Sequence, residues 1–295
     1  MILVAGSANL DFVVRAPHIP APGETVLGRD FKTYPGGKGA NQAIACARAG
    51  GAATTMLLAL GEDAYALPLE DSLNAAEVRL HIKRVADQPT GTAFICVSDD
   101  AENAITVALG ANDSLQPDDM LALPALAQFS HLLLQLETPI DTVTAYARAA
   151  RQQGVKVVLN AAPAQRLSTE LLALVDILIV NEGELAVVSN HSGNLEQCLD
   201  RVNVPCVVVT LGSHGAWARV DGHLLKQAAF PVTPVDTTGA GDTFCGALVA
   251  ALSRGEDHSQ ALRQACAASA LACTKPGAQS SIPTHGDVQI FLKSA

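Results

Sequence analysis

Short apolar runs alternate with helical segments along this chain, and this alternation constrains its fold more than any other feature. The runs are apolar throughout rather than every second residue, which is typical of strands covered on both faces. We predict core strands at Ile2–Gly6, Thr55–Leu60, His131–Leu136, Val155–Asn160, Ile177–Val180 and Val207–Leu211. We predict helices at Lys38–Ala49, Ala64–Ala75, Pro117–Gln128, Thr142–Gln153, Thr169–Leu174, Gly241–Leu252, Ser259–Cys273 and Gly286–Leu292. The pattern predicts an α/β fold: a mostly parallel central sheet with helices on both faces.

Two segments, Phe12–Thr33 and Thr92–Leu109, break this rhythm. Their apolar and polar residues alternate over short distances, which favours half-exposed antiparallel strands outside the main sheet. We expect them to pair into a small β appendage formed by about residues 12–34 and 92–109. Because the chain has no Gly/Ser-rich or Pro-rich linker and no repeat, we expect a single domain over residues 1–295.

Composition excludes several classes of protein. The chain is 49% hydrophobic and 16% charged, so it can bury enough apolar surface to fold. Its formal charge of −10 argues against binding to nucleic acid or to an anionic membrane, since both require a basic surface. The longest uncharged stretch, Met120–Leu136, is too polar to span a bilayer. With no signal peptide expected at the N-terminus, we expect a cytoplasmic protein.

Cysteine usage fits a reducing compartment. The seven cysteines include no C-x-x-C pair, and most lie among Ala, Val and Leu. We therefore expect buried, reduced thiols rather than disulfides. The eight histidines show no H-x-x-x-H or H-E-x-x-H spacing, so a zinc site built on histidines is not expected.

The strongest motif is D-T-T-G-A-G-D-T-F at Asp236–Phe244, directly before an apolar helix. Small residues at a helix start leave the backbone N–H groups of Gly239, Ala240 and Gly241 open to an anion. Asp242 places a carboxylate in the same turn. A general base beside an anion hole is what phosphoryl transfer to an alcohol requires. The structural alternative is a glycine turn in which Asp242 merely caps the helix.

Two further motifs favour a polyol ligand. P-G-G-K-G-A-N-Q at Pro35–Gln42 leads into a helix but lacks the G-x-x-x-x-G-K-[ST] pattern of a P-loop. Its glycines allow close approach of the backbone, and Asn41 offers both a donor and an acceptor. Asn9 and Asp11, which follow the first strand, point the same way and can hold adjacent hydroxyls. The carboxyl ends of parallel strands are where open α/β sheets bind ligands.

The two glycine-rich motifs, in this order, resemble the signatures of the ribokinase-like (PfkB) carbohydrate and nucleoside kinases. The resemblance extends over nearly the whole chain. Shorter matching stretches are Pro20–Thr25, Gly110–Asn112, Gln135–Glu137, Asn181–Glu184, Thr210–Ser213 and Gly277–Gln279.

The resemblance implies an ATP-dependent sugar kinase, most closely one that phosphorylates ribose at its 5-hydroxyl. Asp242 would then deprotonate the hydroxyl, and Gly239, Ala240 and Gly241 would form the anion hole. The sugar would be surrounded by Asn9, Asp11, Gly37, Lys38, Asn41, Glu137 and Asp242. Thr210 and Gly212 would line the ATP site.

The resemblance also implies cations and a dimer. Asn181 and Glu184 would organise Mg²⁺ and its waters beside the nucleotide phosphates. An activating monovalent cation, usually K⁺, would be held by Asp236, Thr238, Ala272, Gly277 and Ser281. The β appendage would be a lid that covers the sugar and excludes water, and pairing of two lids implies a homodimer.

Two alternatives remain open. The same chemistry could act on a nucleoside, on fructose or on another sugar; the scarcity of aromatic residues (4%) argues weakly against a stacked base. A sugar-binding protein without catalysis would predict damage to Asp242, the anion-hole glycines or the N-x-x-E stretch. All of these are intact.

Overall fold

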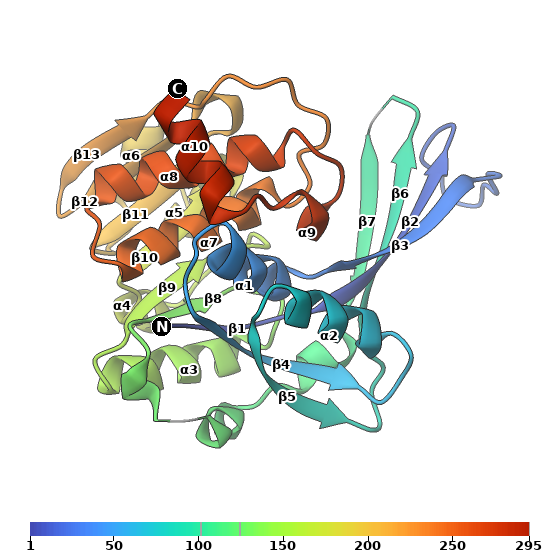
Figure 1. Ribbon diagram of the computed structural model, residues 1–295, viewed down its shortest axis with the longest axis horizontal. Helices are drawn as coiled ribbons and strands as arrows, with labels where there is room; N and C mark the ends of the chain where they lie inside the picture. The colour runs from blue at the N-terminus through green and yellow to red at the C-terminus, as the bar shows by residue number, and fades with distance from the viewer. Residues whose placement is uncertain (101, 124, 295) are drawn as a thin grey trace.

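The computed structural model describes residues 1–100, 102–123 and 125–294 (Figure 1). Within them, one large sheet has the strand order β13-β12-β11-β10-β9-β8-β1-β4-β5. All neighbours from β11 to β5 are parallel, whereas β12 and β13 add an antiparallel edge. The strands are β1 (Ile2–Ala5), β4 (Thr54–Gly61), β5 (Arg79–Val85), β8 (His131–Leu134), β9 (Lys156–Asn160), β10 (Ile177–Asn181), β11 (Cys206–Thr210), β12 (Ala216–Val220) and β13 (His223–Gln227). The predicted α/β fold class is confirmed.

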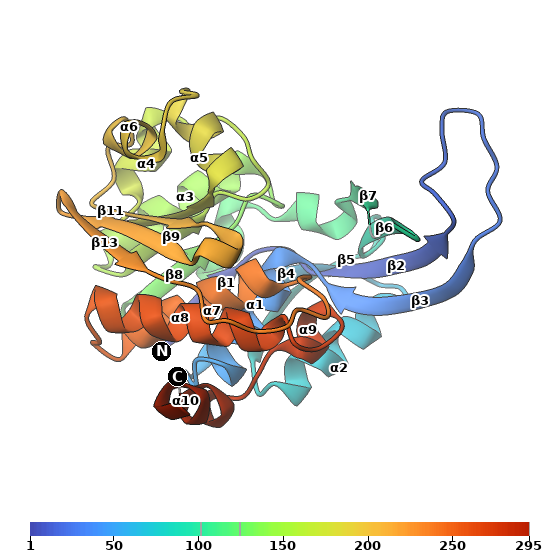
Figure 2. The same cartoon turned by 90° about the horizontal axis from the view of Figure 1, so that it is seen from above.

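The large sheet is covered on both faces, as the apolar runs require. In β1, Ile2 and Val4 pack into the cluster under one helical layer, while Leu3 and Ala5 pack into the cluster under the other. Figure 2 shows the two layers on opposite sides of the sheet. One layer contains α1 (Lys38–Arg48), α2 (Ala66–Ala75), α7 (Ala240–Ser253), α8 (His258–Ala272) and α10 (His285–Ser294); the other contains α3 (Ile140–Gln152), α4 (Thr169–Leu174), α5 (Glu182–Ser189) and α6 (Leu195–Asp200).

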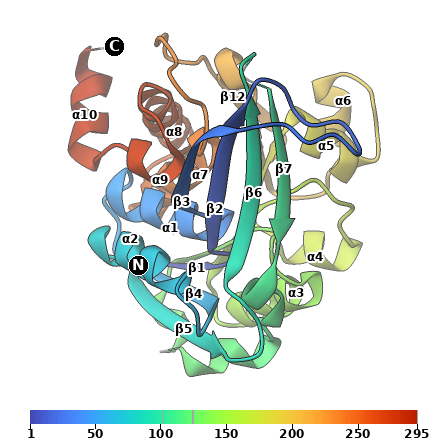
Figure 3. The ribbon, with the colours of Figure 1, turned by 90° about the vertical axis from the view of Figure 1, so that its right-hand side faces the viewer.

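A second sheet projects beside the first in the order β3-β2-β6-β7 (Figure 3). Its strands are β2 (Asn9–Ala16), β3 (Arg29–Gly36), β6 (Gly91–Ser98) and β7 (Asn103–Ala108). We call it the small sheet. The expected antiparallel pairing holds for β2–β3 and β6–β7 but is wrong for the central pair, because β2 and β6 are parallel. β2 follows the carboxyl end of β1, and β6 follows the carboxyl end of β5. Because β1 and β5 point the same way in the large sheet, β2 and β6 also run in the same direction.

Other expectations differ in detail. Residues 117–128 form two short 3₁₀ turns, Pro117–Ala122 and Leu126–Gln128, instead of one α-helix. Two residues of the predicted ranges, Ala101 and Pro124, lie outside the described residues. The sequence analysis missed β5, whose alternating basic residues suit a sheet edge, as well as β12, β13, α5 and α6.

All seven cysteines are free, as expected. Five are buried and two, Cys96 and Cys273, are half-buried. In the described part of the chain, no helix is long and apolar enough to cross a membrane.

Helices α1 and α7 are packed closely, and this contact aligns their N-termini. A Cβ atom added to Gly246 would lie 2.4 Å from Cβ of Ala45 and 2.6 Å from the backbone nitrogen of Cys46. Backbone atoms cannot yield as a flexible side chain can. The glycine therefore sets the distance between the two helices.

We predict that Gly246→Ala lowers the free energy of unfolding by about 1–3 kcal/mol, because the two helices must separate to admit the methyl group. Urea denaturation followed by circular dichroism measures the change. Gly286→Ala in α10 is the matched control, since its nearest neighbour would be 3.7 Å from the new Cβ. Equal stability of the two variants would contradict the prediction.

Candidate active site

The predicted site residues converge where the carboxyl ends of the central strands meet the N-termini of α1 and α7. Asp242 lies in the first turn of α7, which begins after Gly239. Both of its carboxylate oxygens accept hydrogen bonds from α1. Asn41 Nδ2 donates to Oδ2 and Gln42 Nε2 donates to Oδ1, each at 2.9 Å. The carboxylate is therefore fixed in orientation and keeps lone pairs free for a proton.

Glu137, in the loop after β8, is the second carboxylate of this site. Its Oε2 accepts hydrogen bonds from Ser7 Oγ at 2.6 Å and from the backbone nitrogen of Lys38 at 3.0 Å. The loop after β1 and the start of α1 thus hold Glu137 in place together. A held acceptor of this kind suits the hydroxyl of a ligand.

Asp11 is the carboxyl group with the most altered ionisation at this site. Burial, followed by the charges of Glu137 and Asp242, raises the pKa of Asp11 to about 7. A neighbouring side chain could not be accommodated: a Cβ on Gly36 would lie 2.2 Å from Asp11 Oδ2. Asp11 is consequently poised between its neutral and charged forms near neutral pH.

Asn9 is almost fully buried and is held by a residue that sequence reasoning did not assign. Asn112 Nδ2 donates to Asn9 Oδ1 at 2.8 Å, and Asn112 Oδ1 accepts from the backbone nitrogen of Ala8 at 3.0 Å. Gly37 adopts φ +87°, and a Cβ there would lie 2.7 Å from the backbone nitrogen of Asn9. Glycine is therefore required where the backbone of the motif crosses the end of β1.

A cavity of about 180 Å³ leads from Asp242 to the start of α5. Lys38, Asn181 and Glu184 line it together with Gly239 and Gly241. Burial would lower the pKa of Lys38, but the carboxylates of Asp242, Glu137 and Glu184 raise it. Lys38 thus brings a positive charge to a cavity whose other charged lining residues are Asp242 and Glu184.

Asn181 and Glu184 form a capping box at the start of α5. The backbone nitrogen of Asn181 donates to Glu184 Oε2 and the backbone nitrogen of Glu184 donates to Asn181 Oδ1, both at 2.8 Å. Burial raises the pKa of Glu184, although the Asn181 hydrogen bond and Lys38 oppose this rise. A carboxylate and an amide oxygen are donors that suit Mg²⁺ held through water. Among the described residues no group of three His, Cys, Asp or Glu side chains is arranged to bind a metal directly.

The loop before α7 carries the predicted anion hole. Gly239 has φ +73°, and a Cβ there would lie 2.9 Å from Cα of Ala278, so a larger residue is excluded. The backbone nitrogen of Ala240 donates to the Thr237 carbonyl at 3.2 Å. In the described structure, the backbone N–H groups of Gly239 and Gly241 make no such turn hydrogen bond, so they are available to an anion.

The predicted monovalent-cation residues are brought together in part. Asp236 Oδ1 accepts from Thr238 and Asp236 Oδ2 accepts from the backbone nitrogen of Gly277 at 2.8 Å. Burial would raise the pKa of Asp236, but these hydrogen bonds lower it overall.

The other predicted cation residues are Ala272 and Ser281. Ala272 directly precedes Cys273, whose carbonyl accepts from the backbone nitrogen of Asp236 at 3.2 Å. Ser281 Oγ donates to the Ala278 carbonyl, and among the described contacts it does not reach Asp236. A carboxylate and several carbonyls are hard oxygen donors that suit an alkali-metal ion.

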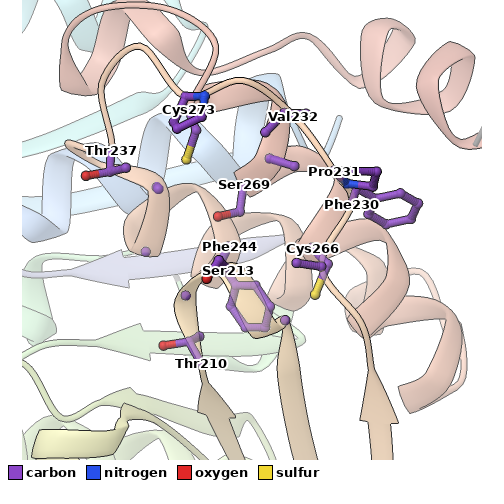
Figure 4. Close-up of a pocket in the computed structure, with 17 residues that line it drawn as sticks. Thr210, Ser213, Phe230, Pro231, Val232, Thr237, Phe244, Cys266, Ser269 and Cys273 are labelled. Atoms are coloured by element: carbon purple, nitrogen blue, oxygen red, sulfur yellow. The ribbon is translucent and has the colours of Figure 1, made fainter.

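A larger pocket of about 460 Å³ lies behind the anion-hole loop, between β11, α7 and α8. Figure 4 shows Phe230, Val232 and Phe244 around it, with Thr210 at its floor. The predicted residues Thr210 and Gly212 both line this pocket. Its apolar walls and few polar groups suit a flat heterocycle.

Sequence reasoning missed the buried amides that support the site. They are Gln42, Asn112, Gln135, Asn160 and Gln279. Gln42, Asn112, Gln135 and Gln279 do lie in the matching stretches quoted above, but a side chain's partner far along the chain is not visible in a motif. Gln279, for example, donates to Asn41 Oδ1 at 3.0 Å across 238 residues.

Comparison with known proteins identifies the class of this protein. The family model described as pfkB family carbohydrate kinase matches residues 1–285. A curated ribokinase of Haemophilus influenzae is 39% identical over 305 aligned positions, covering 100% of this chain and 99% of its own. The ribokinase of Thermotoga maritima superimposes with a TM-score of 0.91 at 34% identity, covering 99% of both chains. The ribokinase of Arabidopsis thaliana, solved with ribose and ATP, gives 0.90 at 34% identity, covering 99% and 98%.

The fold and the site thus define a phosphotransferase that uses an alcohol group as acceptor. The chain belongs to the pfkB family of carbohydrate kinases.

We predict that Asp11→Asn becomes more stable relative to the parent protein as the pH rises. The folded parent keeps the Asp11 proton up to about pH 7, whereas the unfolded chain loses it near 4, so ionisation destabilises the fold in between. The difference in unfolding free energy should move by roughly 2–3 kcal/mol in favour of the variant between pH 5 and pH 8. Denaturation at the two pH values measures it, and a difference that does not depend on pH would contradict it.

Proposed function

We propose that this chain transfers the γ-phosphoryl group of ATP to the 5-hydroxyl of D-ribose. One observation supports this above all: Asp242, held between Asn41 and Gln42, faces a cavity that continues to Lys38 and Glu184. A fixed base thus stands at one end of a channel, with groups suited to nucleotide phosphates at the other. The likeness to ribokinases over the full chain, one of them solved with ribose and ATP, supports ribose as acceptor.

The proposed reaction is an in-line displacement at the γ-phosphorus. Asp242 accepts the proton of the 5-hydroxyl as the sugar oxygen bonds to phosphorus, while the bond to the β–γ bridging oxygen breaks and ADP leaves. The backbone N–H groups of Gly239 and Gly241 hold the negative charge of the transferred group. Lys38 lies in the same cavity and neutralises part of that charge.

The remaining sugar hydroxyls are held by Asn9, Asp11, Asn41 and Glu137, with the backbone of Gly37 closely apposed. This assignment is supported by their convergence at the carboxyl end of β1. Asp11 and Glu137 accept hydrogen bonds and Asn41 can donate or accept. Such a mixture suits a polyol.

ATP is proposed to place its base in the 460 Å³ pocket and its phosphates at the start of α7. Thr210 and Gly212 line the pocket, while Asn181 lies in the neighbouring channel near the phosphates. Glu184 is proposed to hold Mg²⁺ through water. When bound, Mg²⁺ supplies positive charge that screens the β- and γ-phosphates.

A monovalent cation, K⁺, is proposed beside the anion hole, held by oxygens of Asp236, Thr238, Ala272, Gly277 and Ser281. It would stabilise the loop that presents the N–H donors of the hole rather than bind ATP. The hydrogen bonds that already join Asp236 to Thr238 and Gly277 support this role.

We predict that K⁺ raises kcat of the parent protein several-fold, and that Asp236→Asn removes most of this activation without abolishing activity. The measurement is the ADP-release rate across a K⁺ titration at constant ionic strength. A parent rate that is indifferent to K⁺ would exclude the cation site.

The small sheet is proposed as a lid over the sugar, and the whole chain as one kinase domain that carries it. β7 is exposed along its full length, and Phe31, Phe94 and Ile105 of the small sheet are exposed. An exposed strand edge of this kind suits pairing with the lid of a second copy, which gives a homodimer. Sedimentation that finds a monomer alone at micromolar concentration would contradict the dimer.

A cytoplasmic location is also proposed. Seven free thiols suit a reducing compartment, and ATP is available there. Recovery of the protein with the cell envelope after fractionation would argue against it.

The nearest rival keeps the chemistry and changes the acceptor to a nucleoside, fructose or another sugar. A panel that compares ribose with 2-deoxyribose, fructose and adenosine in one ADP-release assay separates these acceptors by kcat/KM. A protein that binds sugar without catalysis is a more distant rival, which would bind ribose but release no ADP.

We predict that Asp242→Asn lowers kcat by about 10²–10⁴-fold, because the amide cannot accept the hydroxyl proton. Ribose affinity, measured by calorimetry, should change much less, since the amide oxygen can still accept a hydrogen bond. Full activity in this variant would refute the role of Asp242 as base.

A further inference from the structure

Buried amide side chains connect to Asp242, and two of them, Gln42 and Gln135, line neither of the two cavities described above. Gln42 is 0% exposed, and its Nε2 donates both to Asp242 Oδ1 and to Asn160 Oδ1, each at 2.9 Å. Gln42 Oε1 accepts from Gln135 Nε2 at 2.7 Å, and Gln135 is 1% exposed. We call Gln42 and Gln135 the amide relay.

The charge on Asp242 sets the direction of this relay. A carboxylate only accepts hydrogen bonds, so Gln42 must turn its NH₂ group toward Asp242 and its carbonyl toward Gln135. Gln135 must then present its own NH₂ group. Its Oε1 consequently lies buried without a donor among the described residues. Reversing both amides would bring that oxygen toward the Gln42 NH₂ group, but it would set the Gln42 carbonyl against Asp242.

Neighbouring backbone fits closely around the amide relay and restricts its side chains to one conformation. A Cβ on Gly6 would lie 2.0 Å from Gln135 Oε1, so only glycine at this position admits the side chain. Gln42 belongs to α1, which is packed against the Asp242 helix at Gly246. Two rigid elements therefore hold the two ends of the Gln42–Asp242 hydrogen bond.

We propose that Gln42, oriented by Gln135, is a positioning residue that fixes the Asp242 carboxylate by a hydrogen bond which favours its charged form, without touching the sugar. The inference deepens the proposed function and rests on it, since it assumes that Asp242 is the base. Asn41 also donates to Asp242, but it is one of the residues proposed to bind the sugar, whereas Gln42 is not.

Other charged groups also act on Asp242, and none of them is substituted in the variants used below. Lys38 of α1 carries the opposite charge, while Glu184 of α5 and Glu137 carry the same charge. Asp11 of β2, whose pKa is raised to about 7, changes charge within the assayed pH range, but it does so in the parent and in each variant alike. The thiol of Cys245 lies one turn further along α7. A change in pH dependence after substitution of the relay is therefore attributable to the relay.

The test compares the full-length parent protein with Gln42→Met and Gln135→Met, which keep side-chain length and remove the amide. Thr54→Val is the matched control: Thr54 is buried at the opposite end of the sheet and bonds locally to the Ala52 carbonyl. Each variant is assayed for kcat and KM with ribose from pH 5.5 to pH 9.5. Its ribose affinity and melting temperature are measured in parallel.

Gln42→Met should lower kcat at pH 7 by about 10–100-fold. It should also shift the acid limb of the plot of kcat against pH to higher pH, by about one pH unit. Much of the lost rate should return at pH 9, and ribose affinity should stay within about twofold, as expected of a group that acts through Asp242. Gln135→Met should shift the acid limb in the same direction by a smaller amount. Thr54→Val should leave the limb in place even where it lowers the melting temperature.

An acid limb in Gln42→Met that coincides with that of the parent, or a rate loss equal at every pH, would overturn the proposal. Should Gln42→Met fail to fold, an unshifted limb in Gln135→Met does the same. A parent protein that releases no ADP with ribose would instead refute the proposed function, so the two failures are distinguishable.

Discussion

The close contact between α1 and α7 is the constraint on which the site depends. Gly246 lets α7 approach α1 until its backbone contacts the Ala45 methyl group and the backbone of Cys46. The N-termini of the two helices therefore lie next to each other. The first turn of α1 supplies Asn41 and Gln42, and the first turn of α7 supplies Asp242. A gap of even one methyl group between the helices would lengthen both hydrogen bonds together. The packing of α1 against α7 therefore also determines the orientation of the Asp242 carboxylate.

Hydrogen bonds from neutral groups, rather than direct ion pairs, orient the carboxylates of this site, and for Asp242 these groups are side-chain amides. Asp242 and Glu184 line one cavity, and burial together with the charges of Glu137 and Asp242 raises the pKa of Asp11 to about 7. A second lysine close to Asp242 would form an ion pair and weaken it as a base. Amide N–H groups orient the same carboxylate by hydrogen bonds and leave its charge in place. Buried amides thus orient the carboxylate that is proposed as the base without adding a charge to the site.

The local parts of this design could be predicted from the sequence, and the long-range parts could not. The glycine motif before α7 is contiguous, so Gly239 and Asp242 were predicted together with their chemistry. The apolar strands predicted the parallel sheet because burial on both faces leaves a local pattern. The parallel pairing of β2 with β6 depends instead on where each strand leaves the large sheet. The Gln42–Gln135 contact joins residues 93 positions apart, and neither side chain carries a local mark of its partner.

The net charge of −10 has a different meaning once the site is built. A protein that binds a polyanionic ligand through surface lysines would carry a basic face, and the composition argues against such a face. At this site the positive potential comes from Lys38, from backbone N–H groups at a helix start and from the proposed cations. Of these, Lys38 is the one that contributes to the count of basic residues. Because fixed dipoles need no reorganisation when charge develops, such a site can be acidic overall and still stabilise a phosphoryl group in transfer.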